Sequence, residues 1–187
     1  MHQSQEIVIA GFGGQGVLSM GQILAYAAMG EGKEVSWMPS YGPEMRGGTA
    51  NCVVIVSPGR ISSPIISRYD SAIVLNQPSF EKFEPRVKPG GLLLFEQSAI
   101  LTSSARKDIE VLGIAALDEA VKMGKRQVAN MVMLGAFLER RSVIRPEHVM
   151  DALKKVLPER HHHLLPLNEQ ALQRGRTLAA QHVVAVG

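Results

Sequence analysis

A glycine-rich segment near the start of this 187-residue chain is the clearest candidate for ligand chemistry. Its spacing is G-x-G-x-x-G; an apolar, β-branched run precedes it at 7–10, and apolar residues at helical spacing follow over 17–29. Glycines between a strand and a helix let a phosphate approach the backbone, and the helix start offers free N–H groups. Close packing of the strand on the helix explains the same glycines almost equally well. The residues that we assign to this candidate cofactor site are Gly11, Gly13, Gly14, Gln15 and Gly16.

The region that should hold the sugar of a nicotinamide cofactor does not fit that ligand. A dinucleotide site expects an acid at the end of the second strand, about 20 residues after the glycines. That strand is predicted over 34–38, and Glu34 stands at its start, away from the ligand edge. No lysine follows the glycines in the way a Walker-type phosphate site requires. The segment is therefore predicted to bind an anion, with NAD not the favoured ligand.

A second glycine-rich segment, residues 40–49, carries one acidic and one basic residue between a Gly-Pro pair and a Gly-Gly pair. Glu44 and Arg46 stand between Gly42-Pro43 and Gly47-Gly48, and they can pair with each other, with backbone amides or with another chain. Removing one member of a buried pair would cost about 3–5 kcal/mol, whereas an exposed pair contributes less than about 1 kcal/mol. We favour an interface or ligand loop over a solvated turn. The residues assigned to this loop are Ser40, Tyr41, Glu44, Arg46, Gly47 and Gly48.

Strand-like runs alternate with helical patterns and predict an α/β fold. We expect a single Rossmann-like domain with a mainly parallel sheet flanked by helices and a helical C-terminal region. The predicted strands are 7–10, 34–38, 51–56, 72–75, 92–95 and 109–112, and the predicted helices are 17–29, 78–87, 117–123, 128–139, 146–156 and 168–180. A Pro-Gly-Gly sequence predicts a turn at 88–91. Both glycine-rich loops follow strands, so both should project from the carboxyl edge of the sheet as neighbours.

Composition excludes several classes of protein. The chain has 20 Lys+Arg against 17 Asp+Glu, a small and scattered excess that predicts neither a nucleic-acid nor a membrane partner. Its one cysteine, Cys52, cannot form an internal disulfide or supply an iron–sulfur cluster or a structural zinc site, and we expect it to be a small buried residue. No apolar run approaches the roughly 20 residues that cross a bilayer, and the polar start is unlike a targeting segment. The expected location is the cytoplasm.

The remaining residue types give no catalytic constellation. No Ser–His–Asp, Cys–His or paired-carboxylate arrangement stands out, so we assign no catalytic residue and no metal site. Trp37 and Met38 are expected to pack in the core, and Asn130 and Asn168 are expected to be helix N-caps. The three consecutive histidines at 161–163 are interpreted as part of a loop.

The two glycine-rich segments together resemble the gamma subunit of the 2-oxoacid:ferredoxin oxidoreductases. The segments are Gly11-Phe-Gly-Gly-Gln-Gly16 and Tyr41-Gly-Pro-Glu-Met-Arg-Gly-Gly48. Further matches over nearly the whole chain are Asn76-Gln-Pro-Ser79, Pro89-Gly-Gly91, Asn130-Met-Val-Met-Leu-Gly135 and Asn168-x-x-Ala171-x-x-x-Gly175. The second segment is more similar to 2-oxoglutarate and 2-oxoisovalerate members than to pyruvate members, which tend to carry a second arginine where this chain has Met45. The resemblance implies that residues 1–187 form one pyruvate/ketoisovalerate oxidoreductase gamma-type domain.

The resemblance also implies a reaction and a division of labour. A 2-oxoacid and coenzyme A become an acyl-CoA and carbon dioxide, while ferredoxin is reduced. Thiamine diphosphate, Mg and iron–sulfur clusters are expected on partners: thiamine-binding and alpha-type oxidoreductase subunits and a ferredoxin-like subunit. The lone cysteine and the lack of a Gly-Asp-Gly thiamine motif agree with that division. In related single-chain enzymes the equivalent domain is associated with coenzyme A binding. The first glycine segment is therefore expected to help place the pyrophosphate of coenzyme A.

The leading hypothesis is a non-catalytic gamma subunit that holds no cofactor tightly. It would brace the thiamine-bearing subunits through the loop at 39–49 and help place coenzyme A. Two alternatives stay open: a stand-alone Rossmann-type nucleotide-binding oxidoreductase, and the related subunit of an indolepyruvate:ferredoxin oxidoreductase. The missing acid after the second strand disfavours the stand-alone nucleotide-binding oxidoreductase. The indolepyruvate:ferredoxin oxidoreductase subunit shares the expected fold and the glycine loop.

Overall fold

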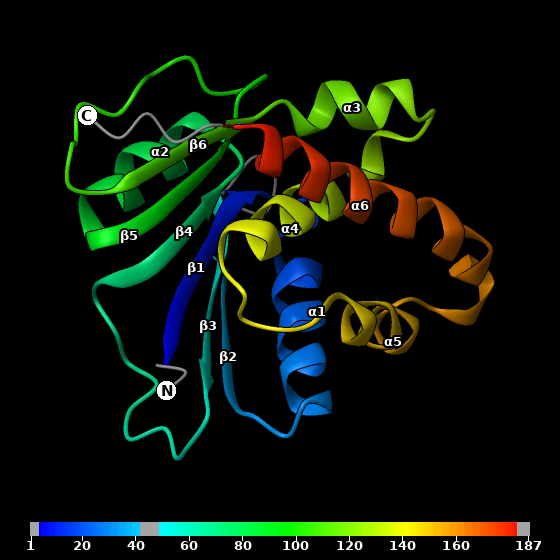
Figure 1. Ribbon diagram of the computed structural model, residues 1–187, viewed down its shortest axis with the longest axis horizontal. Coiled ribbons are helices and arrows are strands. Elements are labelled where there is room, and N and C mark those ends of the chain that lie inside the picture. Colours follow the sequence, from blue (N-terminus) through cyan, green and yellow to red (C-terminus); the bar gives the residue numbers. More distant parts are fainter. Residues whose placement is uncertain (1–3, 42–48, 183–187) are drawn as a thin grey trace.

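The computed structural model describes residues 4–41 and 49–182. Its central element is a six-stranded sheet (Figure 1). The strands, in the spatial order β2-β3-β1-β4-β5-β6, are β1 (Gln5–Phe12), β2 (Glu34–Tyr41), β3 (Thr49–Ser57), β4 (Tyr69–Val74), β5 (Val87–Glu96) and β6 (Glu110–Ile114). The helices are α1 (Val17–Gly30), α2 (Gln77–Phe83), α3 (Ala116–Lys122), α4 (Ala129–Arg140), α5 (Pro146–Val156) and α6 (Leu165–Gln181), with 3-10 turns η1 (Glu84–Arg86), η2 (Arg126–Val128) and η3 (Glu159–Leu164). The predicted α/β class and the helical C-terminal region are confirmed.

The sheet is mainly parallel, as predicted, but one strand runs against the others. Strands β1, β4, β5 and β6 are parallel neighbours, whereas β3 is antiparallel to both β1 and β2. Only residues 42–48 separate β2 from β3, too few for the crossover of a dozen or more residues that a parallel pairing needs. The end of β2 and the start of β3 therefore lie at the same edge as the end of β1. At that edge Tyr41 pairs with Ala50, and Phe12 pairs with Thr49.

The turn predicted at 88–91 is wrong, because these residues belong to β5. The strand begins with Val87 opposite Tyr69 of β4 and resumes with Leu92 opposite Ser71, so the register shifts between the two pairs. The additional residues on β5 form a bulge inside one continuous strand. A bulge uses the same residue types as a turn, and the composition of this segment therefore predicted a turn where the strand continues.

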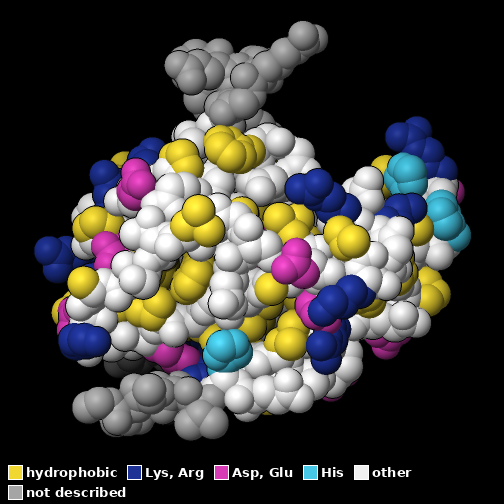
Figure 2. All heavy atoms as spheres, turned by 90° about the horizontal axis from the view of Figure 1, so that it is seen from above, with side chains coloured by type: hydrophobic (Ala, Val, Ile, Leu, Met, Phe, Trp, Pro, Cys, Tyr) yellow, Lys and Arg dark blue, Asp and Glu magenta, His cyan; other side chains and the backbone are white. Residues whose placement is uncertain are grey.

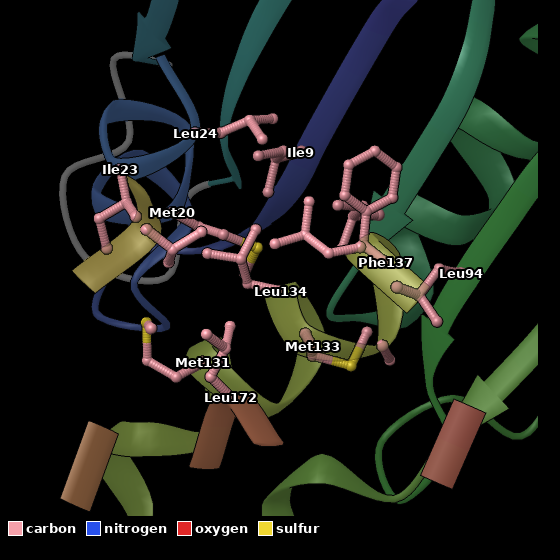
Figure 3. Close-up of a cluster of buried hydrophobic side chains, with 14 of the residues drawn as sticks. Ile9, Met20, Ile23, Leu24, Leu94, Met131, Met133, Leu134, Phe137 and Leu172 are labelled. Carbon is pink, nitrogen blue, oxygen red and sulfur yellow. The ribbon is translucent and has the colours of Figure 1, made fainter. Parts of the chain in front are cut away.

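The larger of two hydrophobic cores lies between the sheet and helices α1, α4, α5 and α6. Figure 3 shows part of it, where side chains from α1, α4 and α6 meet those of β1 and β5. Its fully buried side chains include Ile9, Met20, Ile23, Leu24, Leu94, Met131, Met133, Leu134 and Phe137. Burying a side chain of this kind contributes about 1.5–3 kcal/mol, so this core holds α1 and α4 on the sheet.

The smaller core lies on the opposite face of the sheet, under α2. Phe80 packs edge-on against Phe95, and Phe83 packs edge-on against Tyr69, with ring centroids 5.6 and 5.9 Å apart. The helix that follows β1 thus covers one face, and the helix that follows β4 covers the other. In open α/β sheets, ligands bind at the carboxyl ends of the strands where the covering helices change face. Here that point lies between β1 and β4.

The N-cap roles predicted for Asn130 and Asn168 are wrong. The N-caps of α4 and α6 are Val128 and Leu164, so both asparagines lie inside the first helical turn. The Asn168 amide Nδ2 donates to the Leu164 carbonyl oxygen at 2.8 Å. Each helix continues directly from a 3-10 turn, η2 or η3, and this moves its start upstream of the asparagine.

Helices α4 and α6 touch backbone to backbone. A Cβ added to Gly135 would overlap the carbonyl oxygen of Leu172, and a Cβ added to Gly175 would overlap the carbonyl oxygen of Val132. Neither atom is the end of a flexible side chain, so neither can move aside cheaply. These two glycines therefore allow α6 to cover α4 at close range.

Replacing Gly175 by alanine should destabilise the domain strongly, because the new methyl group must push α6 away from α4. Overpacking typically costs about 1–3 kcal/mol and occasionally more, and backbone offers no relief, so we expect a loss of at least about 3 kcal/mol. The free energy of unfolding in urea measures it. Gly59→Ala is the matched control, since an added Cβ there meets nothing within 4 Å. A Gly175→Ala loss below about 1 kcal/mol would contradict the backbone contact.

Candidate functional site

The first glycine-rich segment links β1 to α1 at the carboxyl edge of the sheet. β1 ends at Phe12, α1 begins at Val17, and Gly16 is the N-cap with φ 77°. The Gln15 side chain closes the loop, because its Oε1 accepts from the Phe12 backbone N–H at 2.6 Å and its Nε2 donates to the Leu75 carbonyl oxygen at 3.2 Å. The strand–loop–helix context predicted from the spacing is therefore present.

Two glycines of this segment are required by packing. A Cβ added to Gly11 would lie 2.6 Å from Gln15 Oε1 and 3.0 Å from Leu75 Cβ. A Cβ added to Gly16 would lie 2.6 Å from Nδ2 of Asn130 on α4. Gly16 also needs its left-handed backbone conformation, which glycine adopts without penalty. Packing is thus a sufficient explanation for both of these glycines.

The other two glycines leave the backbone open. A Cβ added to Gly13 or Gly14 would meet nothing within 4 Å. Beside them, the first turn of α1 contains no acidic residue, and no side chain caps its free N–H groups. A helix start carries about half a positive charge, which favours an anion. The part of the loop available to a ligand is therefore Gly13–Gly14.

A cavity of about 220 Å³ opens beside the loop, over the carboxyl ends of β1, β4 and β5. The segment that runs from η2 into α4 forms another of its walls. Its polar lining consists of Gly14, Gln15, Glu96, Arg126, Gln127 and Asn130. The cavity lies next to the point where the covering helices change face, which is where the fold predicts a ligand site.

Glu96 is the cavity residue that sequence analysis missed. It ends β5 and is only 2% exposed, and its carboxylate accepts from the backbone N–H groups of Ser98 at 2.9 Å and Leu117 at 3.0 Å. Burial raises the pKa of the Glu96 carboxyl above its usual value, Asp118 adds to the rise, and the two N–H groups oppose it. The available signal was position: an acid directly follows the apolar run 92–95 at the end of a strand.

The second glycine-rich loop joins the site only through its flanking residues. Ser40 is exposed near the end of β2, and Tyr41 ends that strand at the edge where β1 also ends. The prediction that both loops start from the same edge is thus confirmed for their strand ends. The assigned residues Glu44, Arg46, Gly47 and Gly48 lie outside the described residues.

The predictions for the residues around β2 and β3 have mixed outcomes. Cys52 is fully buried, as expected; burial raises the pKa of its thiol to about 12, which leaves it protonated. Trp37 is half-buried and packs against the larger core. Met38 is 41% exposed, so its predicted core position is wrong. Successive side chains of a strand face opposite ways, so only one of these two neighbours can reach the larger core.

Charged and metal-binding side chains do not gather on the described surface of this edge. Figure 2 views the molecule from the side toward which β1 ends, and Lys and Arg side chains are interspersed with acidic and hydrophobic ones. The histidines at 161–163 form part of η3 rather than a loop, and over 4–41 and 49–182 no group of His, Cys, Asp or Glu is arranged to hold a metal. No helix in these ranges is long and apolar enough to cross a membrane.

The fold and the cavity define a Rossmann-like α/β domain with a candidate ligand site at its sheet edge. The chain matches the pyruvate ferredoxin/flavodoxin oxidoreductase family over residues 6–178, and it belongs to this family. A 2-oxoglutarate synthase subunit, KorC of Methanocaldococcus jannaschii, is 32% identical over 160 residues, which cover 83% of this chain and 84% of that subunit.

Other similarities extend to a longer protein and to solved structures. The ketoisovalerate oxidoreductase subunit VorA of Methanothermobacter thermautotrophicus is 46% identical over 132 residues, or 71% of this chain, but the chain spans only 27% of that relative. The keto/oxoacid ferredoxin oxidoreductase gamma subunit of Geobacter sulfurreducens has a TM-score of 0.83 at 29% identity, covering 96% of this chain and 98% of that one. The 2-oxoglutarate:ferredoxin oxidoreductase of Magnetococcus marinus shares the fold, with a TM-score of 0.88 at 23% identity, covering 99% of this chain and 32% of that one.

Alanine at Gly16 and alanine at Gly13 should have different effects on stability. Gly16→Ala introduces a side chain at positive φ and against Asn130, so we expect a loss of at least about 2 kcal/mol in the free energy of unfolding. Gly13→Ala fills open space and should stay within about 0.5 kcal/mol of wild type.

The double variant Gly16→Ala with Asn130→Ala separates the two causes of that loss. Removing the Asn130 amide relieves the contact but leaves the backbone strain, so part of the lost stability should return. Equal stability of the Gly16→Ala and Gly13→Ala variants in urea denaturation would show that the packing explanation is wrong.

Proposed function

We propose that this chain is the gamma subunit of a multi-subunit 2-oxoacid:ferredoxin oxidoreductase. The observation that carries the proposal is the family match over residues 6–178, together with near end-to-end similarity to subunits of this kind. The proposed reaction converts a 2-oxoacid, coenzyme A and oxidised ferredoxin into acyl-CoA, carbon dioxide and reduced ferredoxin. The proposed location is the cytoplasm, where a single unpaired cysteine is the usual state.

The proposed role of this chain in the reaction is non-catalytic. Thiamine diphosphate, Mg and the iron–sulfur clusters are assigned to partner subunits, because a cluster needs about four thiolates. The one thiol here, Cys52, is buried with its pKa raised to about 12 and its Sγ 3.7 Å from the Val17 carbonyl oxygen. A thiol in that state is a poor metal ligand and a poor nucleophile.

The proposed substrate is 2-oxoglutarate or a branched-chain 2-oxoacid. The sequence at 41–48 supports this assignment through Met45, which replaces the second arginine of pyruvate-type members. Two relatives support the same assignment, since one is a 2-oxoglutarate synthase subunit and another is a ketoisovalerate oxidoreductase subunit. Partner subunits would determine which of these two kinds of 2-oxoacid is the substrate.

The proposed cofactor contact is with coenzyme A, at the first glycine segment. The protein from Magnetococcus marinus that shares this fold is described with coenzyme A and succinyl-CoA bound. Open backbone at Gly13–Gly14 and the uncapped start of α1 suit a pyrophosphate. Gly11, Gln15 and Gly16 would act by holding that backbone in place.

The second loop is proposed as the contact with the thiamine-bearing subunits. We expect Arg46→Ala to weaken association with those partners at least tenfold, equivalent to about 1.4 kcal/mol, because arginine is frequent among residues that dominate interface energies. Co-expression with the partner subunits followed by titration of the purified chains measures the affinity. The domain alone should keep its wild-type stability.

The matched control is Arg60→Ala, an exposed arginine that follows β3 at the opposite edge of the sheet. It should leave association unchanged. Equal affinity of the Arg46→Ala and Arg60→Ala complexes would refute the loop assignment, and appreciable 2-oxoacid oxidation by this chain without partners would refute the non-catalytic role.

Gly13→Ala tests the contact with coenzyme A inside the assembled enzyme. The methyl group occupies space that the pyrophosphate would need, so the apparent KM for coenzyme A should rise at least about fivefold while the KM for the 2-oxoacid stays constant, a loss near 1 kcal/mol. Lys107→Ala, an exposed residue on the β5–β6 connection, serves as control. An unchanged KM for coenzyme A would remove the glycine segment from the ligand site without affecting the subunit assignment.

A further inference from the structure

A second, smaller cavity lies among the helices that cover the larger core (Figure 1). This helical cavity has a volume of about 130 Å³. Its apolar lining comes from α1, η2, α5 with the residue that follows it, and η3, and consists of Ile23, Val128, Leu153, Val156, Leu157 and Leu164. The first three of these are at most 3% exposed. A sealed apolar cavity of about 150 Å³ admits benzene, so the helical cavity has room for a branched aliphatic group.

The helical cavity is separate from the candidate cofactor cavity. Among the described residues that line it, none belongs to the first glycine-rich segment. The two cavities share only Gln127 and Asn130, on the segment where η2 continues into α4. That segment forms a wall between them, so a ligand in the helical cavity would not contact Gly13 or Gly14.

Five polar side chains line the helical cavity and retain hydrogen-bonding capacity: Ser19, Lys125, Gln127, Asn130 and Asn168. Over 4–41 and 49–182, the first four form neither a hydrogen bond nor an ion pair through their side chains. Asn168 is only 8% exposed, and its one bond there is from Nδ2 to the Leu164 carbonyl oxygen, so its Oδ1 has no partner. Enclosed polar groups are normally paired, which indicates that a partner for these comes from outside the chain.

The charge of the lining favours an anion. Lys125 is half-buried and is the one charged residue among the described residues that line the helical cavity. Apolar neighbours reduce the screening of its charge by water and strengthen its attraction for a negative group. Amide N–H donors on Gln127 and Asn130 can supply further bonds to the two oxygens of a carboxylate. The exposed position of Gln127 shows that the cavity opens to the surface, where such a ligand can enter.

From this combination we infer that the helical cavity binds a small carboxylic acid with a branched aliphatic tail. The carboxylate lies at Lys125, and the tail lies between the apolar side chains of α1, α5 and η3. Each methylene that leaves water strengthens binding by up to about fourfold, so the tail supplies most of the affinity and the amine selects the charge. This site does not depend on the assignment of the chain as a subunit.

NMR titration of the full chain with 4-methylpentanoate, 4-methylpentan-1-ol and acetate tests both halves of the ligand. We expect 4-methylpentanoate to bind with a Kd of about 1 mM, at least tenfold more tightly than acetate, which lacks the branched tail. The alcohol keeps the tail without the charge and should bind at least about fivefold more weakly than the acid. The methyl signals of Leu153 and Leu164 should shift, whereas the amide signals of Gly13 and Gly14 should stay in place.

Two variants test the assignment of the carboxylate and of the tail. Lys125→Gln should reduce the ratio of acid to alcohol affinity below about twofold and leave the affinity for the alcohol unchanged. Lys107→Gln, at an exposed lysine that does not line the cavity, is the matched control and should keep the wild-type ratio. Ser19→Leu places an apolar side chain in the cavity and should weaken the binding of both ligands at least about tenfold. Leucine is the better helix former, so α1 should remain folded.

The wild-type ratios and the Lys125→Gln result decide the question even where the Ser19 variant is unstable. Equal affinity for the acid and for acetate, or for the acid and the alcohol, overturns the inference. Shifts centred on Gly13 and Gly14, or no saturable shift at about 10 mM acid, overturn it as well. Binding that disappears when the chain is assembled with partner subunits would show that a partner covers the cavity and would also overturn it. None of these results would change the proposed function, which association with the partner subunits tests separately.

Discussion

The packing of α4 between α1 and α6 is the constraint on which the candidate site depends. At its first turn, Asn130 lies against the Gly16 turn that begins α1, and one helix turn further α4 meets α6 at Gly135 and Gly175 with no space for a side chain. The same first turn lines the cavity. Close-packed interiors transmit displacement, so moving α4 would move the cavity wall and the start of α1 together. The candidate ligand loop is thereby held by a rigid scaffold, as binding loops generally require.

Most of the fold could be predicted because local pattern and burial agree along the chain. Apolar β-branched runs became strands, and 3.6-residue periodicity became helices. The errors arose where tertiary contacts override a local signal. Asparagine is a good N-cap residue, yet the Asn130 side chain packs beside Gly16, and the Asn168 amide donates to the Leu164 carbonyl oxygen. The antiparallel direction of β3 could be predicted only from the short length of its connection to β2, because the strand pattern itself does not indicate direction.

The candidate site could be predicted only in part, because residue spacing cannot tell a glycine that packs from a glycine that binds. That distinction depends on neighbours far along the chain: Leu75 crowds Gly11, Asn130 crowds Gly16, and nothing crowds Gly13. Glu96 escaped notice for a related reason. A single acid after an apolar run is usually a solvated strand end. Only the tertiary structure shows that Glu96 is buried and accepts a hydrogen bond from Leu117 on α3.

The sheet also connects the two glycine-rich loops in a way that the spacing alone could not show. β1 pairs directly with β3, so the residues that begin β3 at 49–50 are hydrogen-bonded neighbours of those that end β1 at 11–12. Under the proposed function, one of these backbones leads from the partner-facing loop and the other leads into the ligand-facing loop. A partner subunit that orders the start of β3 would therefore act on the backbone that seats the ligand. By thermodynamic reciprocity, a ligand that orders the end of β1 would strengthen the docking of the partner by the same free energy. Under the proposed function, such a linkage would let this chain contribute to catalysis, because it would bind its ligand best when the catalytic subunits are in place.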